Sequence, residues 1–363
     1  MGKYIQMENN YSKMDRRKFL KTSLVGVSLL SPNLLFGNDK KHKYHFIMPP
    51  KPFEYYIKEG KQKGGKILLI GGIHGNEEGG YKASDILIDT DIKKGVLAIL
   101  PRSNPESIFT DLRGYNGDMN RKFANLSPKD SDYYKINSIK NFINDFKPDV
   151  ILSLHDGYGF YAKHHNQWGE CIVIDEWQYN NLELGKIASF VSENLKKQGF
   201  NIPVNNTKTF QKNSHHKEQR KSLTYYSLQN HNIPAFCIEG SKQTSLKRKV
   251  QVHLFALAKF FEIYNVEIEP TFNHILSNID KYLLPKKTQV LVTIGNEKKL
   301  ISNTTTLHIP KGKEIKFNIN NNRGGGVIAK GINVNYKSFY YRHNINFHVQ
   351  NDSNTQFFIK IKG

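Results

Sequence analysis

The stretch Ile67–Gly80, ILLIGGIHGNEEGG, joins a short apolar run to a glycine-rich turn that carries a histidine and a glutamate. A continuous run of isoleucine and leucine is typical of a strand buried on both faces, as in a parallel sheet. The glycines that follow permit a sharp turn of the backbone. His74 and Glu77 therefore lie just past a strand, where they could form part of a zinc site or belong to a strand-to-helix turn that merely tolerates polar residues.

The residues that follow repeat this alternation of strand and helix. Between Lys66 and Tyr264 the strand candidates are KILLIGG, GVLAILP, DVILSLHD, CIVIDE and AFCIEGS, and helical stretches separate them. Strands that alternate with helices predict a wound, mostly parallel sheet flanked by helices. We assign this α/β domain to residues 41–272.

After about Pro270 the composition and the pattern of apolar residues change. Residues 283–363 are rich in Thr, Val, Ile, Asn and Gly, and apolar and polar residues alternate in stretches such as TQVLVTIG and TQFFIKIKG. Alternation of this kind, broken by turn residues, indicates a small all-β, sandwich-like domain. We assign it to residues 273–363.

The N-terminal stretch MDRRKFLKTSLVGVSLLSPNLLFG resembles a twin-arginine export signal. Arg16 and Arg17 precede an apolar run that is too short to span a bilayer stably. The alternative is an ordinary N-terminal helix. We interpret residues 1–40 as the export signal, which predicts a periplasmic protein with no stable membrane span after the signal is cleaved.

The chain of 363 residues is strongly basic, with 53 Lys and Arg against 32 Asp and Glu and a net charge of +21. Such an excess is compatible with nucleic acid, an anionic wall or membrane surface, or acidic substrates. The lysines are scattered and no nucleic-acid-binding motif accompanies them, so we expect no nucleic-acid partner. Cys171 and Cys237 lie in apolar runs, which favours buried free thiols over a disulfide.

Polar side chains recur at the ends of the predicted strands, where open α/β sheets bind their ligands. His155 ends VILSLH and Glu239 ends AFCIE, at positions that correspond to His74 and Glu77 after the first strand. Two histidines and a glutamate form a common catalytic zinc set, which leaves a fourth position for water. Bound zinc lowers the pKa of that water from about 15.7 toward about 7. Glu239 is the candidate for proton transfer, although it could instead cap the following helix.

Other polar residues lie in loops near these strand ends. Arg113, Asn120 and Arg121 lie in a glycine-punctuated loop, and arginine suits the recognition of a carboxylate or an oxyanion. A charged loop of this kind could also be merely solvated. Trp168, in FYAKHHNQWGE, could line a substrate cleft or pack against the domain.

Several of these motifs, in their order, resemble a known family. HGNE, LHDG and CIEGS look like the zinc carboxypeptidases of the M14 type and their succinylglutamate desuccinylase and aspartoacylase relatives. NGDMNRKFANL, LHDGYGFY and QWGECIVIDE are similar to the peptidoglycan DL-carboxypeptidases that determine helical cell shape in epsilonproteobacteria. The resemblance covers about Lys66 to Lys242.

The resemblance implies a role for each candidate residue. One zinc ion would be held by His74, Glu77 and His155. Glu239 would act as general base and then general acid, and Arg113 would stabilise the oxyanion. The terminal carboxylate of the substrate would be clamped by Asn120 and Arg121, which makes the enzyme an exopeptidase. One position departs from the cell-shape enzymes, which carry glutamine where this chain has His74; histidine is the ordinary M14 ligand.

Enzymes of this type trim peptidoglycan tripeptides to dipeptides by releasing meso-diaminopimelate, so the implied partners are peptidoglycan stem peptides. A basic cleft would attract these polycarboxylate substrates. One alternative is an amide hydrolase of the desuccinylase type, but the export signal argues against it. The other is a non-catalytic wall-binding protein, and the complete set of ligands with Glu239 argues against that.

Overall fold

The structure is a computed structural model that describes residues 54–320, 323–330, 332–335, 337–340 and 343–363. The predicted export signal, residues 1–40, lies outside the described residues. Among the helices that are described, none is both long and apolar enough to cross a membrane.

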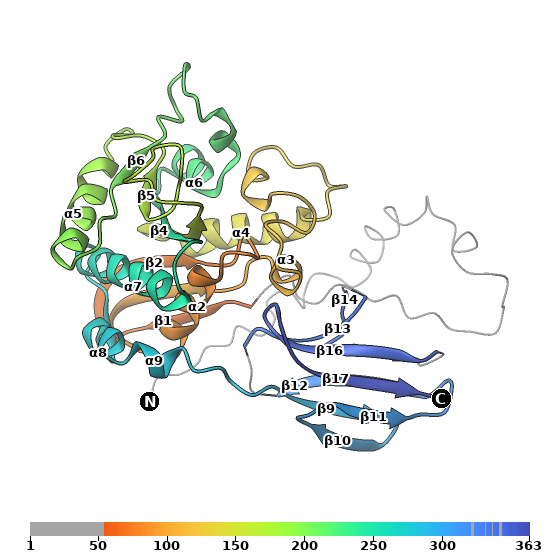
Figure 1. The fold of residues 1–363 in the computed structure, drawn as a ribbon. Coiled ribbons are helices and arrows are strands. Elements are labelled where there is room, and N and C mark those ends of the chain that lie inside the picture. Colours follow the sequence, from red (N-terminus) through yellow and green to blue (C-terminus); the bar gives the residue numbers. More distant parts are fainter. Residues whose placement is uncertain (1–53, 321–322, 331, 336, 341–342) are drawn as a thin grey trace. The chain divides into compact units, whose positions relative to one another are not determined.

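An eight-stranded sheet forms the centre of the α/β region (Figure 1). Its order is β1-β3-β2-β4-β7-β5-β6, with β8 paired to β3. Neighbours β2–β3, β2–β4, β4–β7 and β5–β6 are parallel, whereas β1–β3, β3–β8 and β5–β7 are antiparallel. The strands are β1 (Tyr56–Glu59), β2 (Gln62–Ile70), β3 (Asp91–Leu100), β4 (Val150–Gly157), β5 (Cys171–Ile174), β6 (Val204–Asn206), β7 (Ala235–Ser241) and β8 (Glu267–Glu269). The predicted mostly parallel α/β sheet is confirmed.

Both faces of this sheet are buried, as the apolar run in β2 predicts. Ile67 and Leu69 belong to one hydrophobic core, and Leu68 and Ile70 belong to another. Successive side chains of a strand point to opposite faces, so a strand without polar alternation requires cover on both sides.

Helices supply that cover. The core of Ile67 and Leu69 includes side chains from α2, α5 and α7, and the core of Leu68 and Ile70 includes side chains from α4 and α6. Figure 1 shows α2 and α7 side by side, and the two helices are in contact. The helices are α2 (Glu78–Ile88), α3 (Pro105–Phe109), α4 (Tyr133–Phe146), α5 (Leu184–Lys197), α6 (Leu223–His231) and α7 (Leu246–Ile263), with the short helices η3 (Met119–Arg121) and η4 (Lys217–Lys221).

Two further helices, α8 (Phe272–Ser277) and α9 (Ile279–Tyr282), follow the α/β region. Each of these helices buries one apolar residue, Ile275 in α8 and Ile279 in α9, in the core that also contains side chains of α7. In the all-β domain predicted over residues 273–363, the first strand therefore begins only at Gln289.

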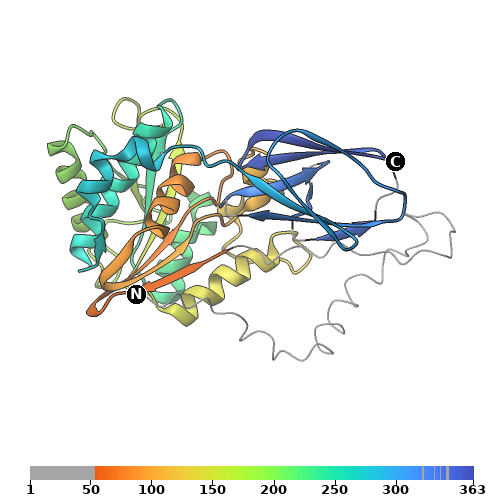
Figure 2. The same cartoon turned by 90° about the horizontal axis from the view of Figure 1, so that it is seen from below.

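Two sheets make up the all-β region (Figure 2). One has the order β10-β9-β12-β15 and the other β11-β17-β16-β13-β14. Val292 and Phe317 from the first sheet share a core with Phe347 and Ile359 from the second, which confirms the predicted sandwich-like architecture. The strands are β9 (Gln289–Ile294), β10 (Glu297–Ile301), β11 (Thr305–His308), β12 (Glu314–Asn320), β13 (Gly325–Ala329), β14 (Ile332–Asn333), β15 (Ser338–Tyr340), β16 (Ile345–Asn351) and β17 (Asn354–Lys362).

Ion pairs connect the all-β region to the α/β region. Asp352, in the turn between β16 and β17, accepts a hydrogen bond from Arg102 Nε at 2.8 Å and from Lys82 Nζ at 2.6 Å. Both terminal nitrogens of Arg102 also bond the carboxylate of Asp85 at 2.6 Å. We call Lys82, Asp85, Arg102 and Asp352 the Arg102 cluster.

Candidate active site

Strand register brings the predicted site residues to one edge of the sheet. Strand β4 runs parallel to both β2 and β7, so the carboxyl ends of the three strands share that edge. His155 and Glu239 are direct partners across β4 and β7. Ile70, the last residue of β2, is the partner of Ser153, and the chain that carries His74 leaves the sheet there.

The glycines after β2 allow the chain to pass close to its neighbours. Gly72 has a φ of 66°, in the left-handed region that favours glycine. A Cβ atom on Gly75 would lie 2.0 Å from the carbonyl of Ser107, so any larger residue would clash with the backbone. The chain can therefore bend back over the sheet edge before α2 begins at Glu78.

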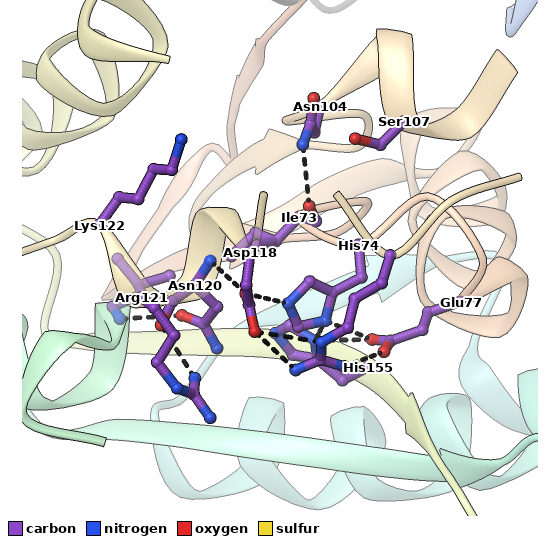
Figure 3. Close-up of polar contacts among 12 residues, drawn as sticks. Ile73, His74, Glu77, Asn104, Ser107, Asp118, Asn120, Arg121, Lys122 and His155 are labelled. Atoms are coloured by element: carbon purple, nitrogen blue, oxygen red, sulfur yellow. Dashed lines mark hydrogen bonds and ion pairs between the residues drawn. The ribbon is translucent and has the colours of Figure 1, made fainter. Parts of the chain in front are cut away.

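Three donor atoms converge at this edge (Figure 3). The Nδ1 atoms of His74 and His155 are 3.1 Å apart, and Oε2 of Glu77 lies 3.0 Å and 2.7 Å from them, respectively. Zinc bonds of about 2.0–2.1 Å in a tetrahedron place neighbouring ligand atoms about 3.3 Å apart, so the three atoms fit such an ion closely. Each of the three residues is only 2% exposed. We call His74, Glu77 and His155 the donor cluster.

The other ring nitrogen of each histidine has its own partner. Nε2 of His74 lies 2.8 Å from Asp118 Oδ1, and Nε2 of His155 lies 3.0 Å from Ser153 Oγ. A proton on each Nε2 satisfies these contacts and leaves the Nδ1 lone pairs directed at the shared point. The sequence patterns did not identify Asp118 as a site residue, although it lies inside the NGDMNRKFANL motif, two residues before Asn120.

The charges of the donor cluster depend on one another. Burial lowers the pKa of His74, but the carboxylates of Glu77 and Asp118 outweigh burial and the net pKa is raised. Burial lowers the pKa of His155, and Glu77 offsets only part of that change. Burial raises the pKa of Glu77, yet the two histidines hold it well below its usual range. Glu77 is therefore an ionised carboxylate, as a metal ligand must be.

The pKa of Glu239 is shifted in the opposite direction from the pKa of Glu77. Glu239 is 7% exposed, and burial together with the Glu77 charge raises its pKa well above the usual range. The thiol of Cys237 donates to Glu239 Oε1 at 3.3 Å. The alternative role of Glu239 as a helix cap is not realised, because Ser245 caps α7 instead. A carboxyl group with a raised pKa holds a proton more tightly than an ordinary one, which suits it to proton transfer.

Two cations flank the outer oxygen of Glu77. Nη1 of Arg113 lies 3.1 Å from Glu77 Oε1, and the half-exposed guanidinium also bonds Asp118. Nζ of Lys242 lies 3.4 Å from the same oxygen and donates to Asn76 Oδ1 at 3.0 Å. Arg113 thus lies beside the donor cluster. The sequence patterns did not identify Lys242 as a site residue, because nothing in the sequence distinguishes one lysine from the many others in a basic chain.

Asn120 and Arg121 lie together in η3, which the carboxylate of Asp118 caps by accepting from Asn120 N at 2.9 Å. Figure 3 shows both residues on one side of the two histidines, with Glu77 on the other side. Asn120 Oδ1 accepts a hydrogen bond at 3.0 Å from the backbone N–H of Leu223 at the start of α6.

Trp168 is half-buried and packs against a small core formed by Cys171, Val173 and Cys237. Its ring lies 5.4 Å from the ring of His216. Trp168 thus packs against the small core that includes Cys237, and the thiol of Cys237 contacts Glu239. Cys171 and Cys237 are buried and free, as predicted.

Comparisons with known proteins identify the family and the fold of this chain. Residues 50–283 match the family described as the catalytic region of the carboxypeptidase controlling helical cell shape. A search of curated proteins finds no significant match. Among solved structures, the apo cell shape determinant protein Csd4 of Helicobacter pylori has a TM-score of 0.56 and 19% identity, covering 85% of this chain and 99% of its own.

Two ligand-bound forms of that Helicobacter pylori protein give similar values. The tripeptide-bound form has a TM-score of 0.56 and 20% identity, covering 85% of this chain and 99% of its own. The form with bound mDAP, described as a D,L-carboxypeptidase, has a TM-score of 0.54 and 20% identity, covering 84% and 99%. At this level of identity the likeness establishes the fold. The family match spans more than half of the chain, so this protein is a peptidase that belongs to the family of carboxypeptidases controlling helical cell shape.

Proposed function

We propose that this protein is a zinc-dependent DL-carboxypeptidase that trims peptidoglycan tripeptides to dipeptides and releases meso-diaminopimelate. The observation that carries the proposal is the convergence of Nδ1 of His74, Nδ1 of His155 and Oε2 of Glu77. Zinc held by these atoms would polarise the scissile carbonyl and acidify the attacking water.

The chain's own residues supply the remaining steps. Glu239, with its raised pKa, accepts the proton of the attacking water and passes it to the leaving amine. Arg113 directs N–H donors toward the donor cluster, where charge develops on the carbonyl oxygen. Trp168 borders the small core beside Glu239 and would line the cleft.

Asn120 and Arg121 would explain why the enzyme cleaves the last peptide bond of its substrate. Arginine pairs well with a carboxylate, and an amide can donate beside it. A substrate held there by its terminal carboxylate places its last peptide bond at the donor cluster. The tripeptide and mDAP found in the Helicobacter pylori structures support peptidoglycan stem peptides as the substrate class.

The location of this substrate supports export of the protein. Peptidoglycan lies outside the cytoplasm, and the Arg16-Arg17 pair before an apolar run supports the twin-arginine route to the periplasm. The net charge of +21 would favour approach to a polyanionic wall. Cell-wall remodelling, and through it cell shape, is the process that we propose the enzyme serves.

A digest of purified muropeptides tests the proposal. Purified protein should convert tripeptide stems to dipeptide stems and release diaminopimelate, which mass spectrometry detects. A chelator should abolish the release and added zinc should restore it. Tetrapeptides and tripeptides with an amidated C-terminus should release no diaminopimelate, because in both the diaminopimelate carboxylate next to the scissile bond is blocked as an amide. Equal cleavage of the amidated tripeptide would rule out the carboxylate clamp, and chelator-resistant release would rule out the metal.

A further inference from the structure

His253, in the middle of α7, is a buried imidazole that none of the steps above uses. It is 0% exposed, and its Nε2 atom lies 3.1 Å from Oδ1 of Asp156, the residue after His155. A carboxylate only accepts hydrogen bonds, so Nε2 carries the proton and donates to Asp156. Nδ1 of His253 has no hydrogen-bond partner among the described residues. The imidazole is thus tied to its surroundings by the one N–H that it directs at Asp156.

Packing alone does not explain a histidine at this position. The residues on either side of it, Val252 and Leu254, are apolar members of the hydrophobic core. An apolar side chain at position 253 would leave no ring nitrogen unpaired, whereas a buried polar atom without a partner is unfavourable. The presence of an imidazole is therefore explained by the donor that it supplies to Asp156.

Asp156 connects His253 to the segment that carries the ligand Glu77. Oδ2 of Asp156 accepts a hydrogen bond from the backbone N–H of Gly79 at 2.7 Å. The backbone N–H of Asp156 donates to Oε2 of Glu77 at 3.3 Å, and this oxygen is the one that lies beside the two histidines of the donor cluster. Asp156 therefore holds the segment at two points: the ligand atom itself and the backbone two residues further on.

The start of α2 depends on this contact. Glu77 is the N-cap residue of α2, and its side chain forms no capping hydrogen bond. The first N–H groups of a helix lack acceptors within the helix, and Asp156 supplies one for Gly79. A Cβ atom on Gly79 or on Gly240 would overlap Asp156 Oδ1, so two glycines make room for this carboxylate. The position of Asp156 therefore fixes where α2 begins and, with it, the position of Glu77.

We propose that His253 is a positioning residue of the metal site, whose Nε2–H orients the Asp156 carboxylate and thereby fixes the start of α2 and the ligand atom of Glu77. This inference rests on the proposed function, since it concerns the same metal. Without that donor the Asp156 carboxylate is free to rotate away from Gly79, and Glu77 loses a support that keeps Oε2 beside the two histidines. Groups that support metal ligands from outside typically change metal affinity by about 10–100-fold.

Two amide variants test the inference. The side-chain amide of glutamine reaches the position of Nε2, whereas that of asparagine is one methylene shorter and reaches only the position of Nδ1. His253→Gln should change zinc affinity by less than about threefold, and His253→Asn should lower it by about 10–100-fold. Competition of each purified protein against a zinc chelator of known affinity measures the loss. The absorption spectrum of the cobalt-substituted protein, which reports ligand geometry, should change only in His253→Asn.

The matched control is Leu257→Ala, one turn further along α7. Leu257 is buried in the hydrophobic core, so its truncation leaves a cavity and lowers the melting temperature, while the bond between His253 and Asp156 remains. The zinc affinity and the cobalt spectrum of this control should match those of the wild type. If His253→Asn does not fold, His253→Met, which fills the same space without an N–H, replaces it in both comparisons.

The outcomes separate the inference from the proposed function. If the wild type takes up no zinc, the proposed metal centre is wrong and this inference falls with it. Equal zinc affinities of His253→Gln and His253→Asn overturn the role of His253 while the proposed carboxypeptidase activity stands. The same holds if Leu257→Ala loses as much zinc affinity as His253→Asn, because the loss then follows stability and not the hydrogen bond to Asp156.

Discussion

The donor cluster and the Arg102 cluster are both buried groups of charged residues, but their geometry differs. In the Arg102 cluster, two carboxylates meet two cations at 2.6–2.8 Å. In the donor cluster, three lone pairs are directed at one point. Complete pairing stabilises a buried charge within the protein itself, whereas converging donors call for an ion from outside.

Two acids show the same contrast in their pKa values. Burial raises the pKa of Asp352, but Arg102 and Lys82 outweigh it and the net pKa is lowered. Burial raises the pKa of Glu239, and the nearby Glu77 charge raises it further. Buried carboxyl groups thus become structural or reactive according to the sign of the charges around them.

Replacement of Glu239 should have the largest effect on activity. Glu239→Gln keeps the size of the side chain but removes the proton acceptor, so kcat/KM should fall by about 10²–10⁴-fold. Metal analysis should find zinc still bound. The control is Glu78→Gln, because Glu78 pairs with Lys249 at 3.2 Å and lies outside the donor cluster. Wild-type turnover by Glu239→Gln would remove Glu239 from the mechanism.

Asp118→Asn should weaken metal binding with a smaller effect. The change preserves an acceptor for His74 but removes the negative charge that orients its ring. Losses of such outer carboxylates typically reduce metal affinity or activity by about 10–100-fold. Competition of the purified variant against a zinc chelator of known affinity measures this change. An affinity equal to that of the wild type would show that Asp118 does not support the site.

Asp352→Asn should affect stability rather than chemistry. Asp352 has a φ of 51°, which asparagine also tolerates, so the change tests the charge alone. Removal of one partner from a buried pair should lower the free energy of unfolding by about 3–5 kcal/mol. Urea denaturation measures this loss, and zinc content at the donor cluster should not change.

The same variant gives a prediction for pH dependence. Because the folded pKa of Asp352 is depressed, its contribution is complete above the unfolded pKa of about 3.9 and is lost as pH falls through the folded value. The stability gap between wild type and Asp352→Asn should be constant from about pH 7 to 5 and should shrink below about pH 4. A gap that widens on acidification would contradict the ionised Asp352.

The smallest effect is expected at an exposed pair between the same two regions. Arg323 bonds Asp89, with side-chain exposures of 25% and 48%, respectively. Surface pairs contribute about 0–1 kcal/mol, so Arg323→Gln should change the free energy of unfolding by less than about 1 kcal/mol. A loss as large as that of Asp352→Asn would show that burial is not what distinguishes the two contacts.

Local sequence patterns determined much of this architecture. The uninterrupted apolar runs predicted strands buried on both faces, and alternation after about residue 283 predicted the all-β sheets. Polar residues at the strand ends, read with the family motifs, identified the set that the structure brings together at one edge. Each of these patterns involves only a few neighbouring residues, so it can be recognised without knowledge of the fold.

Only the tertiary structure decided which atoms meet. The choice of Nδ1 as the converging nitrogen depends on Asp118 and Ser153, which occupy the other side of each ring. Arg102 and Asp352 lie 250 residues apart in sequence, and His155 and Glu239 become neighbours only through the parallel pairing of β4 with β7. Strand order and direction determine such contacts, and periodicity along the chain encodes neither.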